Sequence, residues 1–144
     1  MKFVSVQPLY NLLQREAEKE LFPLVRQTGL GVICYSPLAQ GLLAGRYLAG
    51  LVGDARASYS TSVNPLLTER NLKIVNELAL MAKEKGITLA QLSLAWILHQ
   101  PEVTAPIIGS TRPEQLEENL QAVDVKLSSD DLKRIDEITK PTSQ

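Results

Sequence analysis

The sequence predicts an α/β fold built on parallel strands. Short apolar runs that favour strands alternate along the chain with amphipathic helical segments, and this alternation is typical of parallel strands joined by right-handed crossovers. The run at residues 31–35 is apolar without polar alternation, as in strands buried on both faces of a parallel sheet. Three strands can be recognised, which would leave two open edges. The pattern therefore favours a piece of a larger sheet over a small self-contained domain.

The first third of the chain gives a strand, a helix and a second strand. A β-prone run at residues 3–6 is ended by Pro8, which cannot donate to a sheet ladder. A helix is expected over about 14–27, because four apolar side chains recur at helical spacing: Leu13, Ala17, Leu21 and Leu24. Gly29 is a helix stop, and the strand at 31–35 follows it.

The rest of the chain predicts a long loop, four helices and one further strand. Residues 36–67 are rich in glycine and proline, and a loop of this length is usually functional. After this loop we expect a helix at 69–85, capped by Thr68, and a second helix from the Thr88–Gln91 capping box to just before Pro101. A strand at 105–108 follows. The last two expected elements are a helix from Pro113 to about 121 and a helix from Ser128 to about 138.

Composition excludes several classes of function. The chain has 144 residues, enough for one ordinary domain but not for a complete large barrel. A formal net charge of −1, without a basic stripe, gives no reason to expect a nucleic-acid partner. The longest apolar runs are too short to span a bilayer, so no membrane partner is expected. With a single cysteine, Cys34, and no signal-peptide pattern, the expected compartment is the cytoplasm.

Common catalytic and metal-binding patterns are missing from the sequence. The one histidine, His99, is expected at the end of a buried helix. A histidine there more often interacts with the C-terminus of its helix than acts in catalysis. No Cys/His cluster suggests a metal, and no Ser-His-Asp set can be assembled. The glycine-rich fingerprint of dinucleotide-binding Rossmann folds is also lacking.

Residues 107–113 carry the pattern best suited to a phosphate group. An apolar strand runs into Gly109, Ser110, Thr111 and Arg112, and a helix then begins. Amides at a helix start and the positive end of its dipole attract phosphate, and hydroxyls and a guanidinium add charge-assisted hydrogen bonds. An ordinary helix cap with an exposed arginine fits the same residues equally well.

Two weaker signals follow the other predicted strands. Tyr35 ends a buried strand before a tight polar turn, which fits a ring laid against nicotinamide, although a core tyrosine is the commoner explanation. Gln7 ends the first strand, where its amide fits a bidentate pair with a carboxamide. Since all three segments follow the ends of parallel strands, where (β/α)₈ barrels bind their ligands, their agreement favours a ligand site.

Four segments together carry a family resemblance: VQPLYNLLQREAEKEL, GVICYSPLAQGLLAGRY, TLAQLSLAWILHQPEVTAPIIGSTRPEQLEENL and KLSSDDLKRIDEI. They resemble the C-terminal portion of aldo-keto reductases, in particular the bacterial branch related to potassium-channel β subunits. The match covers essentially all of residues 1–144, and YSPLAQGLL and IIGSTRPEQLEEN are its most specific parts. It implies a partial (β/α)₈ TIM barrel, of which the chain supplies the last three strands and their helices, with about 36–67 as a flap over the cofactor.

The resemblance also implies NADP(H) as cofactor and a set of contacts to it. Gln7 would hold the nicotinamide carboxamide, and Tyr35 would stack on the ring. The pyrophosphate would be lined by Ser36, Pro37, Leu38 and Ala39, with Arg46 closing over it. The adenosine 2′-phosphate would be surrounded by Gly109, Ser110, Thr111, Arg112 and Gln115, and the adenine contacted by Glu118 and Asn119.

The family's catalytic tetrad of Asp, Tyr, Lys and His belongs to the first five strands, which this sequence does not contain. We therefore expect a truncated NADP(H)-dependent aldo-keto reductase that by itself is weakly active or inactive, and that binds a small carbonyl substrate only when the missing strands complete it. One alternative is a non-catalytic half-barrel module that associates with another chain, or with itself, through its open sheet edges. Another is a small α/β domain without a nucleotide site.

Overall fold

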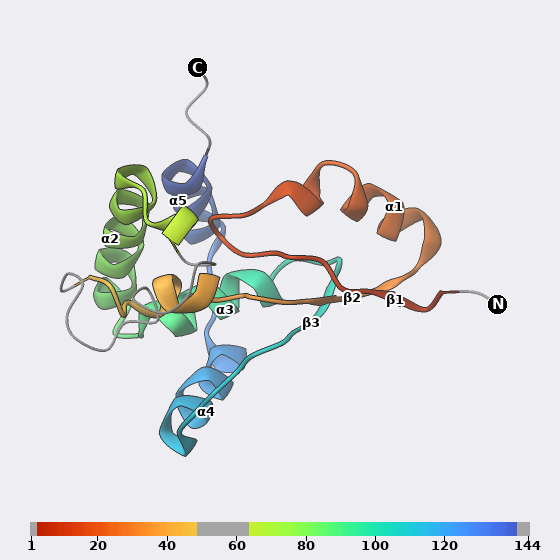
Figure 1. Ribbon diagram of the computed structural model, residues 1–144. Coiled ribbons are helices and arrows are strands. Elements are labelled where there is room, and N and C mark those ends of the chain that lie inside the picture. Colours follow the sequence, from red (N-terminus) through yellow and green to blue (C-terminus); the bar gives the residue numbers. More distant parts are fainter. Residues whose placement is uncertain (1–2, 49–63, 141–144) are drawn as a thin grey trace.

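A computed structural model describes residues 3–48 and 64–140 and shows an open, three-stranded parallel sheet (Figure 1). The strands are β1 (Ser5–Val6), β2 (Gly31–Cys34) and β3 (Val103–Pro106), in the order β1-β2-β3. Both neighbouring pairs are parallel, which confirms the predicted fold class. Within the described ranges, the outer edges of β1 and β3 pair with no further strand.

Five helices accompany the sheet in the described residues. They are α1 (Leu21–Thr28), α2 (Glu69–Glu84), α3 (Leu89–Leu98), α4 (Pro113–Leu120) and α5 (Ser129–Thr139), with 3₁₀ turns η1 (Glu16–Glu18), η2 (Ala39–Ala44), η4 (Asn64–Leu66) and η5 (Gln121–Asp124). In Figure 1, α2 and α5 lie side by side at the end of the molecule away from the N-terminus, and α4 projects on the opposite side from α5. Among these helices none combines the length and apolar character needed to cross a bilayer. Part of the predicted flap, residues 49–63, lies outside the described residues.

Three helices begin where the sequence predicts them. Thr88 and Gln91 form a reciprocal capping box at the start of α3, and Ser128 and Asp131 form another at the start of α5. The Thr68 side chain accepts a hydrogen bond from the Asn71 amide and begins α2. Each cap satisfies amides that a helix start leaves without an internal partner, so the signal is local and can be read from a few residues.

The helix predicted over 14–27 begins later, at Leu21. A proline inside a helix removes a backbone hydrogen bond and clashes with the preceding turn, and the later start places Pro23 in the first turn, where it is tolerated. The apolar spacing also does not identify the buried face of α1, which buries Phe22 and Val25 while Leu24 is 48% exposed.

The third strand lies two residues earlier than the predicted 105–108. Val32 of β2 pairs with Val103, but Ile33 pairs with Ala105, so Thr104 is an extra residue in a β-bulge. The Thr104 hydroxyl accepts the Val32 amide at 3.1 Å and replaces the missing backbone bond. Pairing continues past the strand, where the Ile107 amide donates to the Cys34 carbonyl at 2.8 Å.

One face of the sheet packs on a core centred on α3. Every residue of α3 from Leu89 to Ile97 is buried. Within this core the Tyr10 ring stacks on Trp96 with centroids 5.4 Å apart and meets Phe22 edge-on at 4.9 Å. Aromatic pairs in these arrangements add to the stabilisation from burial alone.

Strand β2 is buried on one face in this chain, where burial on both faces was predicted. Val32 and Cys34 are fully buried, whereas Gly31 and Ile33 are half-exposed. Alternate residues of a strand point to opposite faces, so the helices cover one face, and nothing in the described part of the chain fully covers the other.

Candidate functional site

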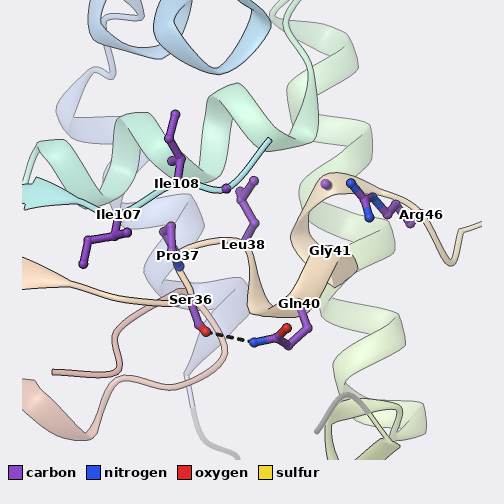
Figure 2. A pocket seen from close by; sticks show the side chains of 10 residues that line it. Ser36, Pro37, Leu38, Gln40, Gly41, Arg46, Ile107 and Ile108 are labelled. Atoms are coloured by element: carbon purple, nitrogen blue, oxygen red, sulfur yellow. Dashed lines mark hydrogen bonds between the residues drawn. The ribbon is translucent and has the colours of Figure 1, made fainter. Parts of the chain in front are cut away.

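Two loops that follow neighbouring strands form a pocket of about 200 Å³ at the carboxyl ends of β2 and β3 (Figure 2). The loop after β2 contributes Ser36, Pro37, Leu38, Gln40, Gly41, Ala44 and Arg46, and the loop after β3 contributes Ile107, Ile108 and Gly109. Figure 2 shows Ile107 and Ile108 on one side of the pocket and the turn at Pro37 and Leu38 on the other. The fold thus joins two of the segments that the sequence singled out.

The loop after β2 contains a concentration of backbone strain. Ser36, Ala39 and Gln40 have φ values of 52°, 48° and 57°, a left-handed conformation that costs an L-residue about 1–2 kcal/mol. The turn is held by hydrogen bonds to Ser36: its carbonyl accepts the Ala39 amide, and its hydroxyl accepts the Gln40 side-chain amide, both at 3.0 Å (Figure 2). Strain of this kind gathers at ligand sites, where the surrounding structure enforces it.

Arg46 brings a positive charge to the pocket across a glycine. The Arg46 stem lies against Gly41, so that a Cβ at Gly41 would come within 2.9 Å of Arg46 Cδ. Gly41 also has a φ of 96°, which favours glycine for a second reason. An exposed guanidinium held against the pocket wall is suited to an anionic ligand.

The loop after β3 exposes three further polar residues next to the pocket wall. Ser110, Thr111 and Arg112 follow Gly109 and are exposed, and Arg112 is the N-cap residue of α4. Both the amide and the hydroxyl of Thr111 donate to the Gln115 side-chain oxygen, each at 3.3 Å. Gly109 lines the pocket, but Ser110, Thr111, Arg112 and Gln115 do not, so the predicted phosphate contacts of these four residues stay a prediction.

Gln7 and Tyr35 lie on the same face of the sheet. The β1–β2 pairing keeps one register from Ser5 opposite Gly31 to the bridge between Leu9 and Tyr35, which places Gln7 opposite Ile33. Because every second residue of a strand points to the same side, Gln7, Ile33 and Tyr35 share the face away from the core. Gln7 is exposed and Tyr35 is 43% exposed, so both side chains are accessible at this face.

Three other predicted site residues are buried or half-buried. Ala39 is fully buried in the core, so its backbone rather than its side chain is available to a ligand. Asn119 is 8% exposed, and Glu118 is half-buried with its carbonyl accepting the Gln91 side-chain amide at 3.1 Å. Their predicted contacts with adenine are not tested by these positions.

Five pocket residues were not among the predicted site residues: Gln40, Gly41, Ala44, Ile107 and Ile108. A signal for the first two was present, since both belong to the specific segment YSPLAQGLL. The two isoleucines belong to the predicted strand at 105–108, but β3 ends at Pro106, so both follow the strand and line the pocket.

The groups with shifted pKa values nearest the pocket belong to the core. Burial raises the pKa of the Cys34 thiol to about 11, so this cysteine stays neutral and is a poor nucleophile at neutral pH. Burial and a hydrogen bond to Glu18 raise the pKa of Tyr10, whose hydroxyl donates to that carboxylate at 2.6 Å. Neither residue lines the pocket, and we assign both a structural role.

Comparison with known proteins places the chain in a family. Residues 1–140 match the model of the aldo/keto reductase family. L-glyceraldehyde 3-phosphate reductase of Escherichia coli (strain K12) is 41% identical over 138 residues, which cover 91% of this chain and 40% of that protein. A probable voltage-gated potassium channel subunit beta of Arabidopsis thaliana is 41% identical over 124 residues, covering 83% of this chain and 38% of that protein.

A third relative, the probable aldo-keto reductase 1 of Glycine max, is 37% identical over 135 residues, covering 91% of this chain and 38% of its own length. The chain therefore spans about 40% of the length of these relatives. An open sheet of three parallel strands is consistent with part of a (β/α)₈ barrel. The chain belongs to the aldo/keto reductase family.

Proposed function

We propose that residues 1–144 supply the NADP(H)-binding part of an aldo-keto reductase barrel, namely its last three strands and their helices. The observation that carries the proposal is the pocket shared by the loops after β2 and β3. In (β/α)₈ barrels, ligands bind at the carboxyl ends of the strands, and phosphate sites often form after the last two. At about 200 Å³ the pocket is smaller than the roughly 300–1,000 Å³ of a complete small-molecule site, as expected for one part of a wall.

The accessible groups match the parts of a dinucleotide. Gln7 and Tyr35, on one face of the sheet, are assigned to the nicotinamide. The turn at residues 36–39 and the Arg46 guanidinium are assigned to the pyrophosphate, and Arg112 with its neighbours to the 2′-phosphate. Guanidinium groups form charge-assisted, often bidentate hydrogen bonds with phosphate, which makes both arginines suitable.

The reaction of the complete barrel would be reduction of an aldehyde or ketone. Bound NADPH supplies the hydride, and the residues of this chain bind and orient the nucleotide. The group that donates the proton belongs to the catalytic tetrad, outside this sequence. Loss of a general acid lowers a rate by about 10²–10⁴-fold, so the chain alone should be weakly active or inactive.

Nucleotide binding tests the proposal directly. We expect the purified chain to bind NADP⁺ in calorimetry, and Arg112→Ala to weaken binding by about 1.5–3 kcal/mol through loss of a charged hydrogen bond. NAD⁺, which lacks the 2′-phosphate, should bind the two proteins alike. Arg134→Ala is the matched control, because Arg134 pairs with Glu84 outside the pocket. Equal NADP⁺ affinity of the Arg112 variant and the unchanged chain would contradict the phosphate assignment.

Activity tests the catalytic part of the proposal. The oxidation of NADPH should be followed with a panel of aldehydes that includes L-glyceraldehyde 3-phosphate, the substrate in the name of the E. coli relative. Rates typical of complete reductases would refute the statement that the chain lacks its proton donor.

A second function is favoured by the open sheet. The outer edges of β1 and β3 are unpaired in the described residues, and the uncovered face bears Tyr35 at 43% and Ile107 at 41% exposure. A module that associates through these edges would bury apolar surface worth about 25 cal/mol per Å². Sedimentation that shows a stable, folded monomer at micromolar concentration would exclude self-association.

A further inference from the structure

The strained residue Ser36 is held by a side chain from a different loop. Its carbonyl accepts a hydrogen bond from Asn11 Nδ2 at 3.0 Å, in addition to the one from the Ala39 amide. Asn11 belongs to the loop after β1 and is 25 positions away in the sequence. A contact between loops is able to stabilise a left-handed residue that its own local sequence does not favour.

Asn11 is itself fixed at every polar atom. It is fully buried, its Oδ1 accepts the Leu13 amide at 2.9 Å, and its Nδ2 also donates to Gln14 Oε1 at 3.0 Å. The backbones of Asn11 and Gln14 exchange two further hydrogen bonds, of 3.2 and 3.1 Å. With one side-chain acceptor and two donors in use, the Asn11 amide has a single orientation that satisfies it.

The two loops are also joined along their backbones just before this contact. The Tyr35 amide donates to the Pro8 carbonyl at 2.9 Å, and the Tyr10 amide donates to the Tyr35 carbonyl at 3.4 Å. The Asn11 bond extends this series to Ser36, which is the first pocket residue after the strand. The loop after β1 therefore determines where the pocket wall begins.

We propose that Asn11 is a positioning residue for the nucleotide site: its Nδ2 holds the Ser36 carbonyl and so keeps the turn at 36–40 in its ligand-binding shape. The inference rests on the proposed function. Asn11 does not line the pocket and acts through Ser36. This role follows from the burial of Asn11 and from its contact with Ser36, and no local sequence pattern indicates it.

The test compares two single variants. Asn11→Asp keeps the shape and the acceptor for the Leu13 amide but replaces both N–H donors by an oxygen that faces the Ser36 carbonyl. NADP⁺ binding should weaken by roughly tenfold, because the hydrogen bond to the Ser36 carbonyl is lost and a repulsion between two oxygens replaces it. Gln14→Leu is the matched control, since it removes the other acceptor of Asn11 Nδ2 and leaves the bond to Ser36. Its NADP⁺ affinity should be unchanged.

Rescue separates positioning from a general loss of stability. Ser36→Gly removes the strain of the left-handed residue, so Asn11→Asp should lose less affinity in the Ser36→Gly background than in the unchanged chain. An equal loss in both backgrounds would overturn the proposal. If the unchanged chain does not bind NADP⁺, the proposed function itself fails; if it binds and Asn11→Asp binds equally well, only the role of Asn11 fails.

A measurement on the unchanged chain decides the question if Asn11→Asp does not fold. The side-chain amide resonances of Asn11 should shift during an NADP⁺ titration followed by NMR, because the Ser36 turn contacts the nucleotide. Those of Gln100, whose side-chain amide donates to the Trp96 carbonyl in α3, should not shift. Unchanged Asn11 resonances at saturation would overturn the proposal.

Discussion

The pocket and the core around Trp96 are built on opposite principles. At the edge of the core, the half-buried Arg15 guanidinium lies 4.8 Å from the Trp96 ring centroid and binds Glu18, Asp136 and Thr139 at 2.7–2.9 Å. Burial alone would lower the Arg15 pKa, but hydrogen bonds to both carboxylates outweigh it and raise the pKa. The loop at the pocket instead has strained backbone and an exposed arginine. The stabilising contacts are concentrated in the core around Trp96. This core supports the pocket loop, whose strained backbone and exposed arginine are suited to binding.

The largest effect is expected from the core. Trp96 is 1% exposed, and Trp96→Ala should lower the free energy of unfolding by about 3–5 kcal/mol, because the cavity cannot be refilled completely. Leu98→Ala is the control in the same helix; Leu98 is 37% exposed and should account for at most about 1 kcal/mol. Urea unfolding followed by circular dichroism measures both. Similar losses for the two variants would contradict a core centred on Trp96.

A smaller loss of stability is expected from removal of the Arg15 guanidinium, which joins the core to α5. Arg15→Met should lower stability by about 1.5–3 kcal/mol, because Glu18 and Asp136 lose a charged hydrogen-bond partner. Lys19→Met removes another cation paired with a glutamate three positions away, but the Lys19 and Glu16 side chains are 70% and 83% exposed. Exposed pairs contribute little, so this control should leave stability nearly unchanged. Equal losses in the same unfolding assay would show that the Arg15 network is no stronger than a surface pair.

Two glycines with a left-handed backbone, one at the pocket and one outside it, separate the effect of backbone strain from the effect of Arg46. Gly41→Ala and Gly29→Ala, at φ values of 96° and 70°, should each cost about 1–2 kcal/mol of stability in thermal or urea unfolding. A new Cβ meets Arg46 at position 41 but nothing within 4 Å at position 29. NADP⁺ affinity should therefore fall for Gly41→Ala alone. A similar fall for both would mean that backbone strain, not the place of Arg46, controls binding.

The smallest effect is a pH dependence at the contact between α2 and α5. A hydrogen bond from Lys85, helped by the Ser128 amide and hydroxyl and opposed by burial, holds the pKa of Asp131 below its ordinary value of 3.8. Since the folded state lowers this pKa, the contribution of Asp131 is present above pH 3.8 and is lost as the pH falls through the lower, folded value. The stability difference between the unchanged chain and Asp131→Asn should therefore shrink below about pH 3.8. Asp130→Asn, exposed in the same turn, is the control. A difference that stays constant down to pH 2 would contradict the shift.

Local signals in the sequence predicted the capped helix starts and the parallel direction of the strands. The capping boxes at Thr88 and Ser128 were read correctly because each depends on residues three positions apart. The prediction over 14–27 is wrong for a reason that is also local, because Pro23 has a stronger effect than apolar spacing on where a helix can begin. The site loops were found from their positions after the strands, while the roles of their individual residues stay predictions.

Other features could not be predicted because they depend on contacts between distant residues. The bulge at Thr104 exists because its hydroxyl replaces a backbone partner for Val32, 72 positions away. β3 also ends at Pro106, earlier than predicted, so Ile107 and Ile108 follow the strand and line the pocket. No local pattern around these isoleucines distinguishes a strand from a pocket wall.

The amino-acid sequence alone determined the family, the α/β class and the helix boundaries marked by caps, since these follow from motifs and short-range hydrogen bonds. The tertiary structure decided which face of α1 is buried, where β3 begins, and how Asn11 reaches Ser36. The physical reason is that packing and hydrogen bonds between distant segments outweigh local preferences of about 1 kcal/mol or less per residue.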